Sequence, residues 1–243
     1  MEDFWSRLRR ETRREHNVSN TLVNLTLPFA LSDRRVYVKA LESFYYVYST
    51  VEEEFDRQRR NFPKIGALYF EELRRKKSFE RDLQFFLGDN WRQKLQGPSS
   101  TVARYIEHIK EVSSSKPWLI LSYVITLYMA LFRGGSILRK ILVVSLALDK
   151  TSGEGVAIYD FPSIIDTEAF FKKYVETVNA LTLPEEQKDE VIEEKRAIFL
   201  WNDEIFNEVR SGPYYRAILW RFFWSVVFVL VVVIFFLKKR NYW

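Results

Sequence analysis

The clearest hydrophobic pattern in the chain lies near its C-terminal end. Residues 222–237 read FFWSVVFVLVVVIFFL, in which Ser225 is the one polar residue. A helix of this length extends about 24 Å, and the apolar residues 218–220 bring it closer to the roughly 30 Å of a bilayer core. Arg221 before the run and the segment KKRNYW after it supply basic and aromatic side chains typical of membrane interfaces. The pattern predicts a membrane-spanning anchor, because a core helix that is apolar on every face needs a larger domain to bury it.

The rest of the chain carries apolar residues at helical rather than alternating spacing. Phe44, Val47 and Val51 recur every three or four positions. Further helices are predicted over residues 2–14, 71–86, 100–113, 118–147, 167–180 and 184–208, with prolines and glycines between them. The sequence therefore predicts an all-α protein. It has a single helical domain over residues 1–212, followed by a membrane anchor with a short basic tail over residues 213–243.

Charge and composition exclude several classes of function. Four of the 37 basic residues and none of the 32 acidic ones follow Ala217, which leaves a nearly neutral body of 33 basic and 32 acidic residues. A general nucleic-acid-binding surface is therefore not expected. The absence of cysteine excludes a disulfide scaffold, a thiol nucleophile and an iron–sulfur cluster. The sequence contains no phosphate-binding loop, dinucleotide fingerprint or nucleophile elbow, so we expect neither a nicotinamide nor a flavin site.

Two local features are candidates for chemistry. His16 follows the cationic segment RLRRETRRE and precedes an apolar stretch, while His108 lies among charged residues and is expected on a helix surface. Gly134 and Gly135 interrupt the apolar run LSYVITLYMALFRGGSILRKILVV, and each costs a helix about 1 kcal/mol relative to alanine. Such a pair permits a kink or close helix packing. It also allows a helix backbone to lie directly over a flat ligand.

Together these features resemble the haem oxygenase family. The matching segments occur in the family's order, and they are RRETRREHN, YVYSTVEEEFDR, YFEELRRKKSFERDLQFFLGDNW, TSGEGVAIYDFP and AIFLWNDEIFNEV. The resemblance covers most of the soluble body. It implies an all-helical fold that holds haem between a proximal helix, which supplies a histidine, and a kinked distal helix that contains glycines. The C-terminal anchor resembles the membrane-bound animal or microsomal type.

The resemblance assigns His16 as the axial ligand of the haem iron. Asn20 stands where the family has a glutamate that accepts a hydrogen bond from the second ring nitrogen, and its amide oxygen can accept the same bond. Arg9 and Arg13 occupy the positions of family lysines that pair with the haem propionates. The same spacing also suits a solvated helix face.

Other pocket positions match the family less closely. The later lysine and arginine positions of the family hold Phe171 and Val175, so that Lys172 is only an adjacent substitute. Phe199 and Phe206 match the phenylalanines that flank the asparagine of the family's late helix. We expect these two aromatic residues and Lys172 to contact haem.

The distal helix carries the main departure from the family. The pattern Gly-Asp-Leu-Ser-Gly-Gly corresponds to ALFRGG at residues 130–135, where Ala130 and Leu131 replace the first glycine and the aspartate that organises distal water. We expect both residues to border the haem. The predicted catalytic residues are Gly134, Gly135, Tyr48 and Asn202. Tyr48, Asn202 and helix carbonyls exposed by the kink are predicted to order water in place of the missing carboxylate.

These assignments predict a membrane-anchored haem oxygenase that acts in haem catabolism. Haem would be both cofactor and substrate, oxygen the oxidant, and biliverdin, carbon monoxide and ferrous iron the products. Electrons would come from an NADPH-dependent cytochrome reductase on the same membrane. Replacement of the distal aspartate by Leu131 predicts slow turnover or relaxed regioselectivity. Two alternatives remain: a catalytically silent haem-binding membrane protein of the same fold, and a tail-anchored helical adaptor in which His16 binds nothing.

The expected location follows from the two ends of the sequence. Residues 1–15 contain five arginines and no apolar run, so no secretory signal is predicted. We therefore expect a tail anchor in the endoplasmic reticulum membrane with the catalytic body in the cytosol. The basic residues after the anchor argue mildly against this orientation.

Overall fold

Helices form the regular structure of this protein, and no β-strand occurs among the residues that the structure describes. The structure is a computed structural model that describes residues 2–30 and 33–240, with the backbone alone described for residues 22–30 and 234–240. The long helices are α1 (Phe4–Glu11), α2 (Arg13–Ala30), α3 (Arg34–Asn61), α5 (Lys76–Leu87), α7 (Ser100–Ser115), α9 (Met129–Ser145), α10 (Thr167–Asn179), α11 (Glu185–Ser211) and α12 (Pro213–Arg240). The prediction of an all-α fold is confirmed.

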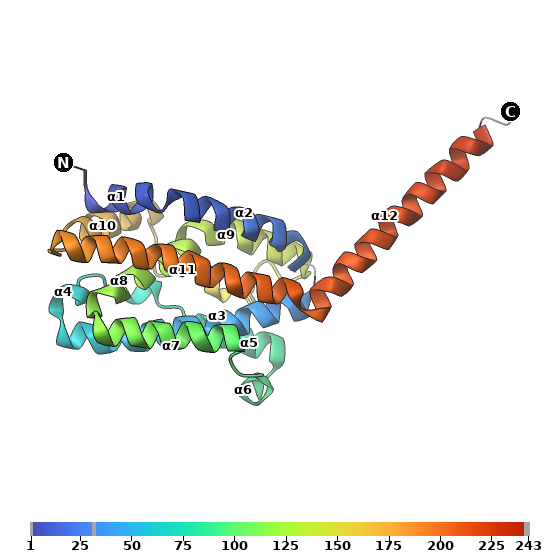
Figure 1. The fold of residues 1–243 in the computed structure, drawn as a ribbon. Coiled ribbons are helices and arrows are strands. Elements are labelled where there is room, and N and C mark those ends of the chain that lie inside the picture. The colour runs from blue at the N-terminus through green and yellow to red at the C-terminus, as the bar shows by residue number, and fades with distance from the viewer. Residues whose placement is uncertain (1, 31–32, 241–243) are drawn as a thin grey trace.

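Short elements connect these helices. They are α4 (Pro63–Gly66), α6 (Trp91–Lys94), α8 (Ile120–Tyr123), the 3₁₀ turns η1 (Glu71–Leu73), η2 (Pro117–Leu119) and η4 (Ala157–Tyr159), and a π-helical segment, η3 (Val124–Tyr128). Helix α3 supplies much of the core, and its residues Val47, Val51 and Phe55 are buried as their spacing predicts. Helices α1 and α2 run along α11, which places the N-terminal segment against the late helix (Figure 1).

Two predicted helices are divided in the structure. The segment 71–86 consists of η1 followed by α5, because the buried carboxylate of Glu52 accepts hydrogen bonds from the backbone N–H groups of Arg75 (2.6 Å) and Lys76 (2.9 Å) and so starts α5 anew. The segment 2–14 is divided at Thr12, whose hydroxyl donates to the Leu8 carbonyl at 2.8 Å. Helix α2 begins directly after this break.

The long apolar segment 118–147 is also irregular, but upstream of its glycines. The π-helical segment η3 interrupts the helix before α9, and a π turn leaves backbone carbonyls without their usual partners. The hydroxyl groups of two buried tyrosines donate hydrogen bonds to two of these carbonyls. Tyr48 donates to the Leu127 carbonyl at 2.7 Å, and Tyr174 donates to the Val124 carbonyl at 3.3 Å. Gly134 lies within the regular part of α9.

Helix α12 projects from the helical body (Figure 1). Two described segments are long and apolar enough to cross a membrane: Pro117–Ser145, which is 61% buried within the body, and Pro213–Val233, which is 0% buried. The first is therefore a core helix, and the second is the candidate anchor. The predicted interfacial residues Tyr242 and Trp243 lie outside the described residues. The predicted division into 1–212 and 213–243 stays a prediction.

Candidate functional site

His16 presents an accessible imidazole on α2. Its side chain is exposed, and the ring of the buried Phe199 on α11 meets it edge-on, with ring centroids 5.8 Å apart and an interplanar angle of 88°. This contact restricts the orientation of the imidazole. Among the described residues, none hydrogen-bonds the His16 ring, so both ring nitrogens are open to a ligand or a partner. Asn20 lies one turn later and is also exposed.

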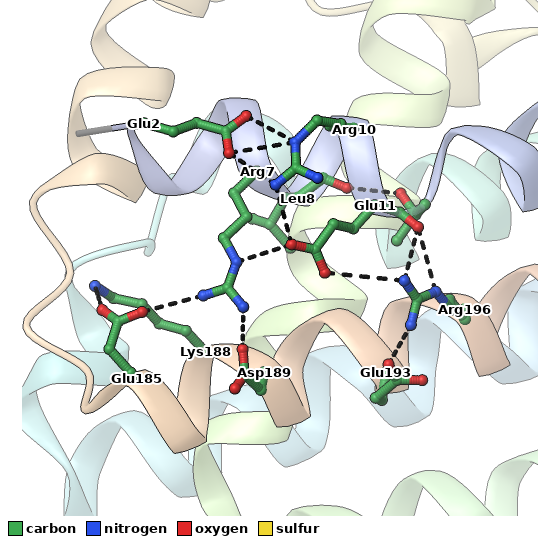
Figure 2. Close-up of polar contacts among 11 residues, drawn as sticks. Glu2, Arg7, Leu8, Arg10, Glu11, Glu185, Lys188, Asp189, Glu193 and Arg196 are labelled. Atoms are coloured by element: carbon green, nitrogen blue, oxygen red, sulfur yellow. Dashed lines mark hydrogen bonds and ion pairs between the residues drawn. The ribbon is translucent and has the colours of Figure 1, made fainter.

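Polar contacts fix the proximal helix α2 against α11. The Ser19 hydroxyl donates to the Asp203 carboxylate at 2.6 Å, and Arg196 donates to the Glu11 carbonyl at 2.8 Å, where α1 ends. The side chain of the same Glu11 also forms an ion pair with Arg7, at 2.9 Å. Figure 2 shows the resulting network between α1 and α11, which also includes Glu2, Arg10, Glu185, Lys188, Asp189 and Glu193. The Ser19–Asp203 bond therefore joins the helix of His16 to the helix of Phe199, and the network in Figure 2 joins the preceding helix α1 to α11.

Helix α9 carries an exposed apolar stripe. Its members recur at helical spacing on one face, and they are Ala130, Gly134, Ile137, Ile141 and Val144. Three of their side chains are unusually exposed for large apolar groups, at 64% for Ile137, 37% for Ile141 and 73% for Val144. A contiguous exposed apolar surface of this kind marks a binding surface. The stripe was not recognised in the sequence, although its spacing was the available signal.

The two predicted glycines lie in different environments. A Cβ atom on Gly134 would meet no atom within 4 Å, so open space lies beside this part of α9. A Cβ on Gly135 would lie 2.9 Å from Cδ1 of Tyr159. Gly135 therefore packs against η4, whereas Gly134 leaves the backbone accessible to a ligand.

The residues predicted to order distal water already have partners. Tyr48 is buried and donates its hydroxyl proton to the Leu127 carbonyl, next to the start of α9. The Asn202 side-chain oxygen accepts a hydrogen bond from Tyr105 at 3.5 Å. Leu131 is partly buried and packs against the hydrophobic core. The two side chains predicted to order water are therefore engaged by protein, and Leu131 contributes an apolar group.

The predicted basic residues are divided between two places. Arg9 on α1 and Arg13 at the start of α2 are both exposed, on the segment that leads to His16. Lys172 lies on α10 in a shallow groove of about 550 Å³ beside Trp5, and its ammonium is 4.0 Å from Glu176. Among the described residues, no other predicted site residue lines that groove.

Helix α11 carries two further residues near the site, Phe206 and Lys195. The Phe206 ring packs against Phe44, with ring centroids 5.4 Å apart. Lys195, which was not among the predicted site residues, is only 8% exposed and lies one turn before Phe199. Burial and the charge of Arg9 lower the pKa of Lys195 to about 8. The sequence carried no signal of this burial, because a lysine on a helix normally extends into water.

The residues present suit a haem group. The site offers one accessible imidazole, an open glycine-bearing apolar stripe and cations on the proximal segment. A planar apolar ring with an iron centre and carboxylates at one edge matches these three features. The fold and the site thus define an all-α protein class built to hold a flat, metal-bearing ligand.

Comparisons with known proteins agree with this class. The heme oxygenase family model matches residues 2–208. A heme oxygenase 1 from Nostoc is 34% identical to this chain over 180 residues, which cover 74% of each protein. Heme oxygenase 1 from Rattus norvegicus is also 34% identical, over 179 residues that cover 73% of this chain and 61% of the rat protein. The structure resembles the crystal structure of heme oxygenase-1 from the cyanobacterium Synechocystis in complex with heme, with a TM-score of 0.83, 31% identity and coverage of 93% of this chain and 100% of the other.

This chain belongs to the heme oxygenase family. It is a haem-degrading oxidoreductase of the biliverdin-producing type, for which haem is both substrate and prosthetic group.

Proposed function

We propose that this protein is a membrane-anchored haem oxygenase in which His16 is the axial ligand of the haem iron. The observation that carries the assignment is the accessible His16 imidazole, held edge-on by Phe199. Gly134 and Ala130 would border the flat face of the ring, and Arg9 and Arg13 would pair with its carboxylates. Haem, when bound, supplies an iron centre that activates oxygen against the ring itself. The protein's own part is to bind, orient and desolvate the ring.

The distal side favours slow or less selective ring opening. Leu131 supplies neither a proton nor a hydrogen-bond acceptor, and the Tyr48 hydroxyl is committed to the Leu127 carbonyl. Water near Gly134 would then be ordered by backbone carbonyls alone, which hold it less firmly than a carboxylate does. Mixed biliverdin isomers are expected. The same features favour the alternative of a haem-binding protein with little turnover.

The chain must obtain electrons from another protein. Its sequence has no nicotinamide or flavin fingerprint. We infer that an NADPH-dependent cytochrome reductase on the same membrane is the donor, and that α12 raises the encounter rate by keeping both proteins on one surface. The proposed membrane is that of the endoplasmic reticulum, with the body in the cytosol. In this orientation the exposed Asn17, which begins the sequon Asn-Val-Ser, carries no glycan.

A spectroscopic turnover experiment tests the proposal. The full chain, in detergent or lipid discs, is loaded with haem, and its Soret band is followed in air while reductase and NADPH are added. Loss of the band with formation of biliverdin, abolished by His16→Ala, is the expected result. A Soret band that persists after reduction of the iron would indicate the silent haem-binding alternative. Failure to form any Soret complex would indicate the adaptor.

A second variant tests the distal explanation. Leu131→Asp restores a carboxylate at the position where the family has one, and it is expected to raise the rate of biliverdin formation and narrow the isomer distribution. Leu131→Asn, which lacks the charge, is the matched control. An isomer distribution equally broad in wild type and Leu131→Asp would reject the distal explanation while leaving haem oxygenation in place.

A further inference from the structure

The Lys195 side chain is mostly buried, and its ammonium group has no partner among the described residues. It lies on α11, its side chain is 8% exposed, and no described residue forms a hydrogen bond or an ion pair with its ammonium group. Lys188, two turns earlier on the same helix, pairs with Glu185 at 2.7 Å. A lysine side chain this deeply buried normally has such an anion nearby, since a charge that leaves water without one is costly.

The side chain belongs to the face of α11 that forms the proximal site. Lys195 precedes Phe199 by four residues and Phe206 by eleven, so the three side chains project from one side of the helix. The Phe199 ring contacts His16. The next residue, Arg196, projects from another side and enters the network in Figure 2.

The electrostatic surroundings of Lys195 are cationic. The charge that acts on it among the described side chains is that of Arg9, which together with burial lowers the pKa of the lysine to about 8. Arg13 adds a further exposed cation at the start of α2. Among the described residues, none forms an ion pair with Arg9, Arg13 or Lys195, and an anionic ligand would relieve the repulsion between these cations.

We propose that Lys195 binds a carboxylate of the ligand, namely a propionate of haem, from the buried side of the site. This inference rests on the proposed haem-binding function. Arg9 and Arg13 would meet the propionates from the exposed side. Lys195 would thereby compensate for the positions of Phe171 and Val175, where the family pattern has basic residues and this chain has none.

A comparison of two ligands tests the proposal. Dissociation constants of haem and of haem dimethyl ester, whose propionates are neutral, are measured by Soret titration of the full chain. We expect Lys195→Met and Lys195→Gln each to weaken haem binding about 10- to 100-fold, as for loss of a charge-assisted bond. Binding of the dimethyl ester is expected to change by less than about 3-fold. Lys110→Met, which removes an exposed lysine of α7 outside this site, is the control and is expected to leave both constants unchanged.

The thermal midpoint of the haem-free protein provides an independent check. Removal of an unpaired buried charge is expected to leave the midpoint of Lys195→Met equal to that of wild type or higher. The proposal for Lys195 is wrong if the variants lose affinity for both ligands equally, since Lys195 would then only shape the pocket, or if they bind haem as wild type does. If wild type forms no complex that depends on His16, the proposed function itself fails, and the Lys195 proposal fails with it.

Discussion

Two adjacent glycines on α9 have different effects on stability and on ligand binding. Gly134→Ala is expected to leave the free energy of unfolding unchanged or raise it by up to about 1 kcal/mol, because a Cβ there meets no atom and alanine favours the helix. Gly135→Ala is expected to lower it by about 1–3 kcal/mol, because the new Cβ lies 2.9 Å from the Tyr159 ring. Urea unfolding of the haem-free variants measures both changes.

Gly135→Ala is expected to be the less stable of the two variants, but Gly134→Ala is expected to have the lower haem affinity per folded molecule. Gly134→Ala fills the open space beside α9 and is expected to weaken haem binding, whereas Gly135→Ala acts only through packing. Soret titration of the folded fraction separates the two effects. Equal destabilisation by both substitutions would show that Gly134 also packs against protein.

His108 makes stability depend on pH. The hydrogen bond between its Nε2 and Glu194, at 2.9 Å, raises the pKa of His108 above its usual 6.5 in the folded protein. A raised folded pKa means that the stabilisation is fully present below about pH 6.5 and is lost as pH rises through the folded value. His108→Gln is therefore expected to cost most at acidic pH. Denaturant unfolding of both proteins between pH 5.5 and 9 tests this, and a cost that grows with pH would contradict it.

At the scale of elements, the attachment of α1 and α2 to α11 controls the proximal site. Arg196→Met removes the bonds to the Glu11 carbonyl at the end of α1 and leaves that carbonyl without its protein donor. We expect haem to dissociate about 3- to 10-fold faster, with the spectrum of the His16 complex unchanged. Arg104→Met is the control, because its exposed pair with Glu204 is expected to contribute little. Transfer of haem to an acceptor such as apomyoglobin measures the rate.

Helix boundaries could be predicted where the cap is local in sequence. Helices α7 and α10 begin where predicted because Ser99 and Asp166, directly before them, accept their first backbone N–H groups. The start of α5 was missed because Glu52, more than twenty residues earlier, caps it through a tertiary contact to Arg75 and Lys76. The π-helical segment was missed for the same reason, since its carbonyls are satisfied by tyrosines from α3 and α10.

Site residues, like helix boundaries, could be predicted only where the signal is local in sequence. His16 and Gly134 could be proposed from the sequence because each belongs to a local motif with a recognisable resemblance. The sequence could not show that Gly135 is a packing residue, since its partner Tyr159 comes from a later segment. It also could not reveal that Lys195 is only 8% exposed, because a lysine on a helix normally extends into water and its burial here depends on tertiary packing around α11.

At the scale of the whole molecule, α12 begins as part of the body before it becomes an anchor candidate. Tyr215 is 3% exposed and packs with Val36 of α3 and Val209 of α11, and the Arg35 guanidinium lies 4.4 Å from the centre of the Tyr214 ring. Ile218 packs against the same cluster. The structural body therefore continues through about two turns of α12.

This continuity predicts different results for two truncations. A chain ending at Gly212 loses the buried Tyr215 and is expected to be less stable by about 1–3 kcal/mol, whereas a chain ending at Leu219 keeps the cluster and is expected to unfold like the full body. Both lack most of the apolar run and are expected to stay in solution when mixed with lipid vesicles, while the full chain co-floats with them. Thermal unfolding and vesicle flotation measure the two properties. Equal stability of the two truncated chains would place the boundary of the folded body at Gly212. Flotation of the chain that ends at Leu219 would show that membrane attachment does not require the apolar run.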